Sequence, residues 1–317
     1  MITLLFLYSN VYAQGSAESY PVRPVTWILA AAAGGGIDFE SRLYAQKLGD
    51  IFGKNFVIDY KPGAGATIGA AYVAKAAPDG YTIISLSPSH TISALVYPNL
   101  PFDINKDFSP ISLTSKRPSL IMVHPSVPAR TLAEYIAYVK ARPTQVNVGT
   151  AGKGEIGDLA LHWLHWLGGM EVTYIQYKGG APSYTALVSG EIQFTLGSPA
   201  AMVGNIRSGK VRLLAVSTRE RIKLFPDVPT VDEQGLAGFD YAQWIGVAAP
   251  ARTPTTIINR LSFELAKIVK LPEVLQKLSD DGTIMIGSTP EQMRQYLADE
   301  SARWRKVVVD AGLNLAE

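Results

Sequence analysis

Short apolar runs alternate along this chain with longer segments in which apolar residues recur at a helical spacing. This alternation of strand and helix patterns predicts an α/β protein with largely parallel sheets. We expect strands at residues 25–30, 55–60, 81–86, 119–124, 145–149, 172–176, 191–196, 211–216, 243–249 and 283–286.

The length of the chain indicates two lobes. Its 317 residues are too many for one ordinary α/β unit and suit two. No repeat or low-complexity linker divides it, but two long extended segments, Leu120–His124 and Gln243–Val247, could cross between lobes. We therefore expect a discontinuous first lobe (20–121 with 245–317), a second lobe (122–244), and a ligand cleft at the crossover.

A glycine-rich loop follows the first predicted strand. Val25–Leu29 leads through Ala30 to Ala33 into Gly34-Gly35-Gly36, and a helical segment continues from Asp38. Glycine lets the backbone approach a ligand closely, and a helix N-terminus offers unpaired amides and the positive end of its dipole. The loop could therefore hold an anion such as a carboxylate, although a tight strand-to-helix turn would use the same small residues.

Two further loops have a similar composition. Val146–Val148 leads through Gly149 to Gly154 into an amphipathic helix, and Phe194–Leu196 leads through Gly197-Ser198-Pro199-Ala200 into another. Ligands of open α/β sheets bind at the carboxyl ends of the strands, so the three loops could converge on one cleft.

The composition of the chain limits the classes of partner that we expect. The chain is 47% hydrophobic and 18% charged with a formal net charge of +2, and no basic run is interleaved with aromatic residues. Nucleic acid is therefore an unexpected partner. There is no cysteine, which excludes disulfides and thiol chemistry and would suit an oxidising periplasm.

The first 19 residues have the pattern of a signal peptide or a disordered start. Met1–Leu7 is apolar and too short to span a bilayer, and Val11-Tyr12-Ala13 fits a small-x-Ala cleavage site. The basic residues that usually begin such a segment are missing.

Two other chemistries have partial patterns. Gly152–Gly157 matches the G-x-G-x-x-G dinucleotide fingerprint, but the next predicted strand ends in Gln176-Tyr177-Lys178 and offers no acid for a ribose. Asp158, His162 and His165 share one helix face at a spacing that could bind zinc, and a solvated polar face is the plainer interpretation.

Catalytic motifs are not evident. The chain contains no G-x-S-x-G elbow and no Walker loop, and no histidine or acid is tied to Ser198 by sequence. His90 and His124 are isolated, and an isolated histidine is more often structural. We expect no cofactor, no metal and no enzymatic activity; a nucleotide-dependent enzyme that uses Gly152–Gly157 is the alternative.

From about Tyr20 to its C-terminus, the chain resembles a known family, the solute-binding receptors of tripartite tricarboxylate transporters, also called Bug or TctC-like receptors. The resemblance rests on the order and spacing of Pro24–Trp27, Gly34–Asp38, Arg42, Lys61–Gly65, Ile68-Gly69, Pro78–Thr82, Tyr177–Gly180, Gly209–Arg212, Leu214–Val216, Phe225–Thr230, Ala249-Pro250 and Thr253-Pro254.

The resemblance implies a two-lobed, type II-like periplasmic binding protein that closes over a small carboxylate. In this family the carboxylate is held by backbone amides and ordered water, here from the first glycine loop and from Thr150–Gly154. The receptor would be a periplasmic monomer that delivers its ligand to membrane permease subunits. A sensor that signals to a membrane kinase is the alternative, and the sequence does not separate the two.

Three departures from the family pattern bear on the ligand. Ala30–Ala33 replaces the usual Pro-Phe-x-Pro, Lys153 replaces an Asn, and Asp158 replaces a His. A missing aromatic ring and one added cation favour a longer or aromatic dicarboxylate, unless Lys153 points to solvent. The expected ligand-binding residues are Ala31, Ala32, Ala33, Gly34, Gly35, Gly36, Ile37, Asp38, Ser87, Ser89, His90, Thr150, Ala151, Gly152, Lys153, Gly154, Gly197, Ser198, Pro199 and Trp244.

Overall fold

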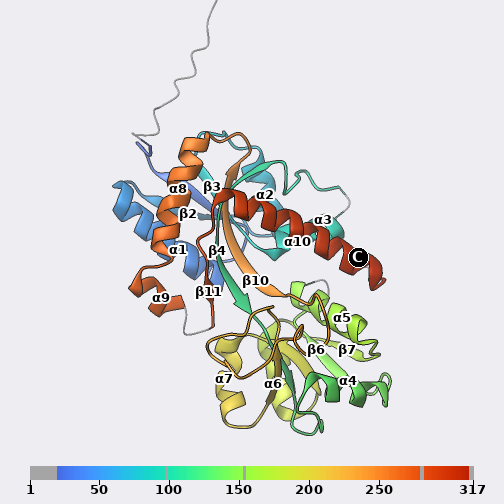
Figure 1. Cartoon of the computed structure of the whole chain (residues 1–317). Helices are drawn as coiled ribbons and strands as arrows, with labels where there is room; N and C mark the ends of the chain where they lie inside the picture. Colours follow the sequence, from blue (N-terminus) through green and yellow to red (C-terminus); the bar gives the residue numbers. More distant parts are fainter. Residues whose placement is uncertain (1–19, 98, 153–154, 279–281, 314–317) are drawn as a thin grey trace, which may run out of the picture.

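Two α/β lobes, each built on its own sheet, make up the computed structural model, which describes residues 20–97, 99–152, 155–278 and 282–313 (Figure 1). The first sheet has the order β11-β4-β10-β3-β1-β2, and the second has the order β7-β6-β8-β5-β9. The first lobe carries the sheet made of β1 (Val25–Leu29), β2 (Phe56–Tyr60), β3 (Thr82–Leu86), β4 (Phe108–Pro118), β10 (Ala242–Pro250) and β11 (Ile284–Met285). The second carries β5 (Leu120–Val123), β6 (Asn147–Thr150), β7 (Thr173–Gln176), β8 (Phe194–Gly197) and β9 (Arg212–Val216).

Helices cover both faces of each sheet, as the burial of their apolar sides requires. In the first lobe α1 (Gly36–Phe52), α8 (Thr255–Ile268) and α9 (Pro272–Leu278) share one core, while α2 (Thr67–Ala74) and α10 (Pro290–Asp310) share the other. In the second lobe α4 (Leu132–Lys140) and α5 (Ile156–Gly168) cover one face, and α6 (Gly180–Ser189) and α7 (Pro199–Arg207) cover the other. The 3-10 turn η2 (Ala64–Ala66) and α3 (Pro88–Val96) lie at the edge of the first lobe that faces the second.

All ten predicted strands are present, within a few residues of their expected bounds. The sheets are mixed, however, rather than largely parallel. Strands β1, β2 and β3 are parallel, and so are β6, β7 and β8, but β10 and β5 run antiparallel to their neighbours. The reason is that β10 and β5 belong to the segments that carry the chain between the lobes.

Strand β4 was not predicted, although it is a long partner of β10. Its sequence contains Pro110 and several hydroxyl residues, so it does not have the usual apolar pattern of a central strand. Those hydroxyls are buried because each has a partner: Ser112 Oγ donates to Ser288 O (2.8 Å), and Thr114 Oγ1 donates to Ile245 O (3.0 Å).

Two adjacent chain segments connect the lobes. One passes from β4 to β5 through Ser119, and the other enters β10 after Tyr241. Ser217 ties them together, because Ser119 N donates to Ser217 Oγ (2.8 Å) and Ser217 Oγ donates to Tyr241 O (2.6 Å). Figure 1 shows β4 and β10 reaching from the first lobe to the second.

The last helix also reaches the second lobe. The Trp304 ring on α10 lies 5.8 Å, centroid to centroid, from the Trp163 ring on α5, in an edge-on arrangement. Trp304 and Val307 belong to the hydrophobic core of the second lobe, and Glu300 accepts hydrogen bonds from the indoles of Trp304 (3.0 Å) and Trp244 (3.2 Å). The contacts between the lobes therefore extend beyond the two connecting segments.

Candidate functional site

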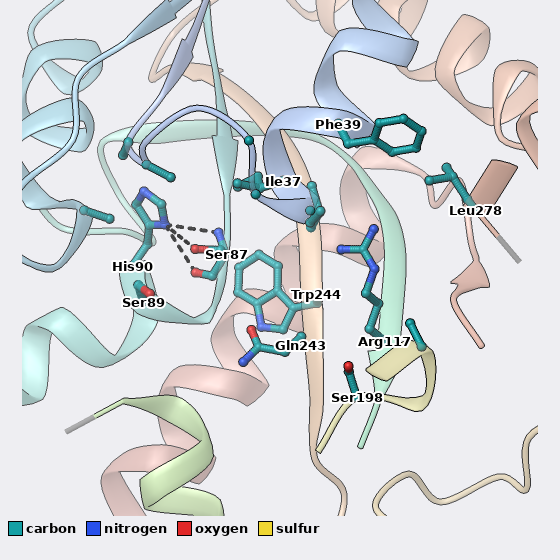
Figure 2. A pocket seen from close by; sticks show the side chains of 18 of the residues that line it. Ile37, Phe39, Ser87, Ser89, His90, Arg117, Ser198, Gln243, Trp244 and Leu278 are labelled. Atoms are coloured by element: carbon teal, nitrogen blue, oxygen red, sulfur yellow. Dashed lines mark hydrogen bonds between the residues drawn. The ribbon is translucent and has the colours of Figure 1, made fainter. Parts of the chain in front are cut away.

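A cleft with a volume of ≈ 1030 Å³ lies where the two lobes meet the connecting strands (Figure 2). Small-molecule sites are usually concave, with a volume of roughly 300–1,000 Å³. Its lining comprises Ala30, Ala31, Gly34, Gly35, Gly36, Ile37, Phe39, Gly65, Ala66, Ser87, Ser89, His90, Arg117, Ser198, Pro199, Ala200, Val203, Gln243, Trp244, Ile245, Lys277 and Leu278.

The glycine loop forms one wall of this cleft. Gly34 has φ +93°, a conformation that side chains rarely adopt, whereas Gly35 has an extended backbone (φ −82°, ψ 172°) and is the N-cap of α1. No side chain caps this helix, and a Cβ added at Gly34 or Gly35 would meet nothing within 4 Å. The helix N-terminus is therefore open to the cleft, which is the arrangement that favours an anion.

Asp38 holds the loop from behind and does not line the cleft. Its carboxylate accepts hydrogen bonds from Gly34 N (2.8 Å), Arg42 Nε (2.8 Å) and Tyr60 OH (2.6 Å). Burial by itself raises the pKa of Asp38, but these hydrogen bonds outweigh it and leave the pKa below its ordinary value. One amide of the loop is thus already bound to an internal carboxylate, which leaves Gly35 and Gly36 at the open helix end.

A buried ion pair stands next to the glycine loop. Arg117 on β4 donates from Nη2 to Glu40 Oε2 on α1 (2.9 Å), and its Nη1 lies 3.0 Å from where a Cβ on Gly36 would be. Glu40 also accepts from Tyr44 OH (2.8 Å) and Ser115 Oγ (2.9 Å). Burial raises the pKa of Glu40 even though Arg117 and these hydroxyls lower it.

The charged side chains that line the cleft are cationic. Arg117 keeps 20% of its side chain exposed, and Lys277 at the end of α9 is exposed. No aspartate or glutamate is found among the described residues of the lining. A carboxylate in this cleft would meet the helix N-terminus, Lys277 and the Arg117 guanidinium, whose charge is shared with the buried Glu40 carboxylate behind the lining.

A second polar group comes from the carboxyl end of β3. Ser87 is the N-cap of α3, and the side chain of His90 accepts a hydrogen bond from Ser87 N (3.1 Å). Ser87, Ser89 and His90 all line the cleft. In the view of Figure 2, the Trp244 ring lies between His90 and Arg117, so these two polar groups are on opposite sides of an aromatic surface.

The second lobe contributes the start of α7. Ser198 caps that helix by accepting from Ala201 N (3.4 Å), and Ser198, Pro199, Ala200 and Val203 line the cleft. Because β6 and β8 are parallel neighbours, the loop that follows Thr150 is at the same edge of the sheet. The glycine loop and the Ser198 loop therefore do lie on facing sides of one cleft.

Several predicted site residues are outside the cleft lining. They are Ala32, Ala33, Asp38, Thr150, Ala151, Gly152 and Gly197. Thr150 is buried, and its hydroxyl donates to Gln176 Oε1 (2.6 Å). Lys153 and Gly154 lie outside the described residues, so the predicted role of Lys153 stays a prediction.

The cations Arg117 and Lys277 and much of the apolar lining were not predicted from the sequence. Arg117 and Gln243 belong to connecting strands, Lys277 and Leu278 end a helix far along the chain, and Phe39 is one turn into α1. No local pattern marks these residues. Phe39 supplies an aromatic ring to the cleft, so the four alanines of the first loop do not leave it without one.

The polar face expected on α5 is not solvated. Asp158 and His165 are only 3% and 2% exposed, because Tyr174 and Gln176 of β7 lie against this side of the helix. His165 Nδ1 lies 2.8 Å from Leu161 O and its Nε2 lies 3.1 Å from Tyr135 OH; burial lowers its pKa to about 3. Among the described residues, no group of three or more His, Cys, Asp or Glu could hold a metal ion.

Comparison with known proteins identifies the family. A family model described as "Tripartite tricarboxylate transporter family receptor" (TctC) matches residues 41–313. The chain belongs to this family. The receptor is 31% identical over 317 residues to the protein BugT of Bordetella pertussis, an alignment that covers 99% of this chain and 97% of BugT.

Solved structures agree with this assignment and with the two-lobed fold. The receptor matches the R. palustris protein Rpa4515 with adipate at 34% identity and a TM-score of 0.77, covering 92% of this chain and 98% of that one. It matches MatC from Rhodopseudomonas palustris with bound malate at 31% identity and a TM-score of 0.73, covering 91% and 100%. Within the described residues, no helix of the receptor is both long and apolar enough to span a membrane.

Proposed function

We propose that this receptor captures a small organic carboxylate between its two lobes and performs no catalysis on it. The observation that carries this proposal is the glycine loop at the uncapped N-terminus of α1, next to Arg117, in a cleft that Lys277 also lines and that has no acid among its described lining residues. Backbone amides, a helix dipole and nearby cations compensate a carboxylate for the water that it gives up.

We further propose that the ligand is a dicarboxylate. The two solved relatives contain adipate and malate, which are both dicarboxylates. In the view of Figure 2, Ile37 and Trp244 give the cleft apolar surface between the His90 side and Arg117, and Phe39 lies beyond Arg117 near Leu278. An aliphatic chain or a ring could lie on this surface while each carboxylate meets a polar group, since an unpaired buried carboxylate is costly.

Lobe closure completes the site in this proposal. The lobes would comprise residues 20–121 with 245–317, and residues 122–244, and would rotate about the segments at Ser119 and Tyr241. Closure would bring the Thr150–Gly152 loop, at the same sheet edge as the Ser198 loop, toward a ligand bound on the first lobe. Affinity would then depend on the free energy of closure as well as on the contacts.

The setting proposed for this activity is the periplasm, with the closed receptor acting as a monomer that delivers its ligand to the membrane permease subunits of a tripartite transporter. A sensor that engages a membrane kinase is the alternative. Measuring the uptake of labelled adipate by cells with and without the receptor separates the two. Uptake that does not change when the receptor is deleted would contradict the transport role.

Binding to the purified receptor tests the proposed ligand class. Isothermal titration calorimetry with adipate, malate, hexanoate and NAD⁺ should give tight binding of a dicarboxylate, weaker binding of hexanoate and none of NAD⁺. A ligand at 100 times its dissociation constant should add about 2.7 kcal/mol to the free energy of unfolding. Tight NAD⁺ binding without carboxylate binding would refute the receptor proposal. Equal affinity for adipate and hexanoate would refute only the dicarboxylate proposal.

A further inference from the structure

A cation stands at the N-terminus of α1, where the helix dipole disfavours it. Arg117 Nη1 lies 3.0 Å from the position that a Cβ on Gly36, the first residue of this helix, would take. A positive side chain near a helix N-terminus costs free energy, because the unpaired amides there already carry partial positive charge. An anion close to both the guanidinium and the helix end would offset this repulsion.

Glu40 supplies one such anion from inside the first lobe. Its carboxylate is fully buried, does not line the cleft, and accepts from Arg117 Nη2 (2.9 Å). Arg117 Nε donates to Thr283 Oγ1 (3.0 Å). These two hydrogen bonds fix the plane of the guanidinium, so little side-chain entropy remains to be lost when a ligand binds to it.

The guanidinium also reaches the cleft. Arg117 is part of the lining, and its side chain is 20% exposed. In the view of Figure 2, the guanidinium lies between Trp244 and Leu278. Gly35 and Gly36 line the same cleft, and Nη1 is the nitrogen beside Gly36. One carboxylate at this point can therefore accept from Nη1 with one oxygen and from the helix amides with the other.

We propose that Arg117 is a specificity-determining residue that donates from Nη1 to a ligand carboxylate at the open end of α1, and that Glu40 is the positioning residue behind it. Glu40 holds the guanidinium in place and also weakens its attraction for the ligand, because two carboxylates then share one cation. This inference rests on the proposed function and names the side chain that recognises one carboxylate of the ligand.

The substitution Glu40→Gln separates the two effects of Glu40. Glutamine keeps an acceptor for Arg117 Nη2 and removes the negative charge that competes with the ligand. Glu264→Gln is the matched control, because Glu264 is also ion-paired, to Lys267 (2.9 Å), and does not line the cleft. The double variant Glu40→Gln with Arg117→Met removes the cation without leaving the buried carboxylate behind.

Calorimetry with adipate measures these effects. Glu40→Gln should tighten adipate binding about threefold or more, whereas Glu264→Gln should change it less than about twofold. The double variant should bind adipate about tenfold more weakly than Glu40→Gln, which corresponds to about 1.4 kcal/mol. In the wild-type receptor, the ¹⁵N signal of Arg117 Nε should shift when adipate is added. That signal is assigned by its absence from the spectrum of the double variant.

Three results would overturn these roles. They are unchanged or weaker adipate binding by Glu40→Gln, equal affinities of Glu40→Gln and the double variant, or an Arg117 signal that adipate does not move. If the double variant does not fold, Glu40→Gln and the Arg117 signal, assigned then by selective arginine labelling, decide the question. Failure of the wild-type receptor to bind any carboxylate would instead refute the proposed function and remove the basis of this inference with it.

Discussion

Replacing Arg117 with methionine should destabilise the receptor by leaving a buried carboxylate without its cation. Glu40 is fully buried, and Arg117 donates to it over 2.9 Å. Arg117 Nε also donates to Thr283 Oγ1 (3.0 Å), so the arginine links β4 to both α1 and the C-terminal part of the first lobe. Methionine keeps most of the side-chain volume and removes the charge and the donors.

The expected size follows from the burial of the pair. Removing one partner of a buried ion pair typically costs about 3–5 kcal/mol. We expect about 3 kcal/mol here, because Arg117 is partly exposed and because the hydroxyls of Tyr44 and Ser115 continue to donate to Glu40. At about 2 °C per kcal/mol for a chain of this size, the melting temperature should fall by roughly 6 °C.

The pH dependence identifies Glu40 as the source of the lost stability. Burial raises the pKa of Glu40 in the folded state, so folding favours the protonated carboxyl. The contribution of Glu40 to the free energy of unfolding is therefore present at low pH and is lost as the pH rises through that pKa. Arg117 lowers the pKa of Glu40, so removing Arg117 should raise that pKa further. The free energy of unfolding should then continue to fall up to a higher pH. The deficit of Arg117→Met should therefore be larger at pH 8 than at pH 5.

Thermal unfolding followed by circular dichroism at these two pH values tests the argument. The double variant Glu40→Gln with Arg117→Met removes the unpaired charge and should recover much of the deficit at pH 8. An equal deficit at both pH values, together with a double variant no more stable than the single one, would show that the buried carboxylate is not the cause.

Three further predictions concern the loops and the cleft. Gly149→Ala should lower the free energy of unfolding by about 1–3 kcal/mol in a denaturant titration, since its Cβ would lie 2.3 Å from a side-chain carbon. In the control Gly204→Ala on α7, the added Cβ has no atom within 4 Å, and the free energy of unfolding should rise by about 0.5–1 kcal/mol. Gly34→Ala forces a side chain to φ +93° and should weaken adipate binding in calorimetry together with a lower melting temperature, while an unchanged affinity would remove Gly34 from the site. Lys277→Met should slow adipate association in stopped-flow experiments about twofold at low salt and not at 0.5 M salt, and a salt-independent effect would contradict an electrostatic role.

The sequence by itself determined the architecture. Strand and helix signals are local, because a side chain's alternation or helical period depends only on its near neighbours in the chain. That is why ten strands and the glycine loop before α1 could be predicted, and why the family resemblance is confirmed. The prediction missed β4, because its buried hydroxyls form hydrogen bonds with carbonyl groups on distant segments.

The tertiary structure alone decided the chemistry of the cleft walls. Arg117 lies in the cleft because folding brings β4 next to Glu40 of α1, and Lys277 comes from α9, more than two hundred residues after the glycine loop. Asp38 lies in the predicted loop but is bound from behind by Arg42 and Tyr60. The burial of a side chain and its hydrogen-bond or ion-pair partners depend on which distant segments meet in the folded chain. These contacts cannot be read from local patterns in a single sequence.

His90 shows both levels in one residue. From the sequence, His90 was expected among the ligand-binding residues, although an isolated histidine is more often structural. In the folded chain, His90 Nδ1 accepts the capping hydrogen bond from Ser87 N, which is a structural role. His90 also belongs to the cleft lining, and its Nε2 is buried without a partner among the described residues. The local sequence determines the cap at Ser87, whereas the packing of distant segments determines that His90 Nε2 is buried without a hydrogen-bond partner among the described residues.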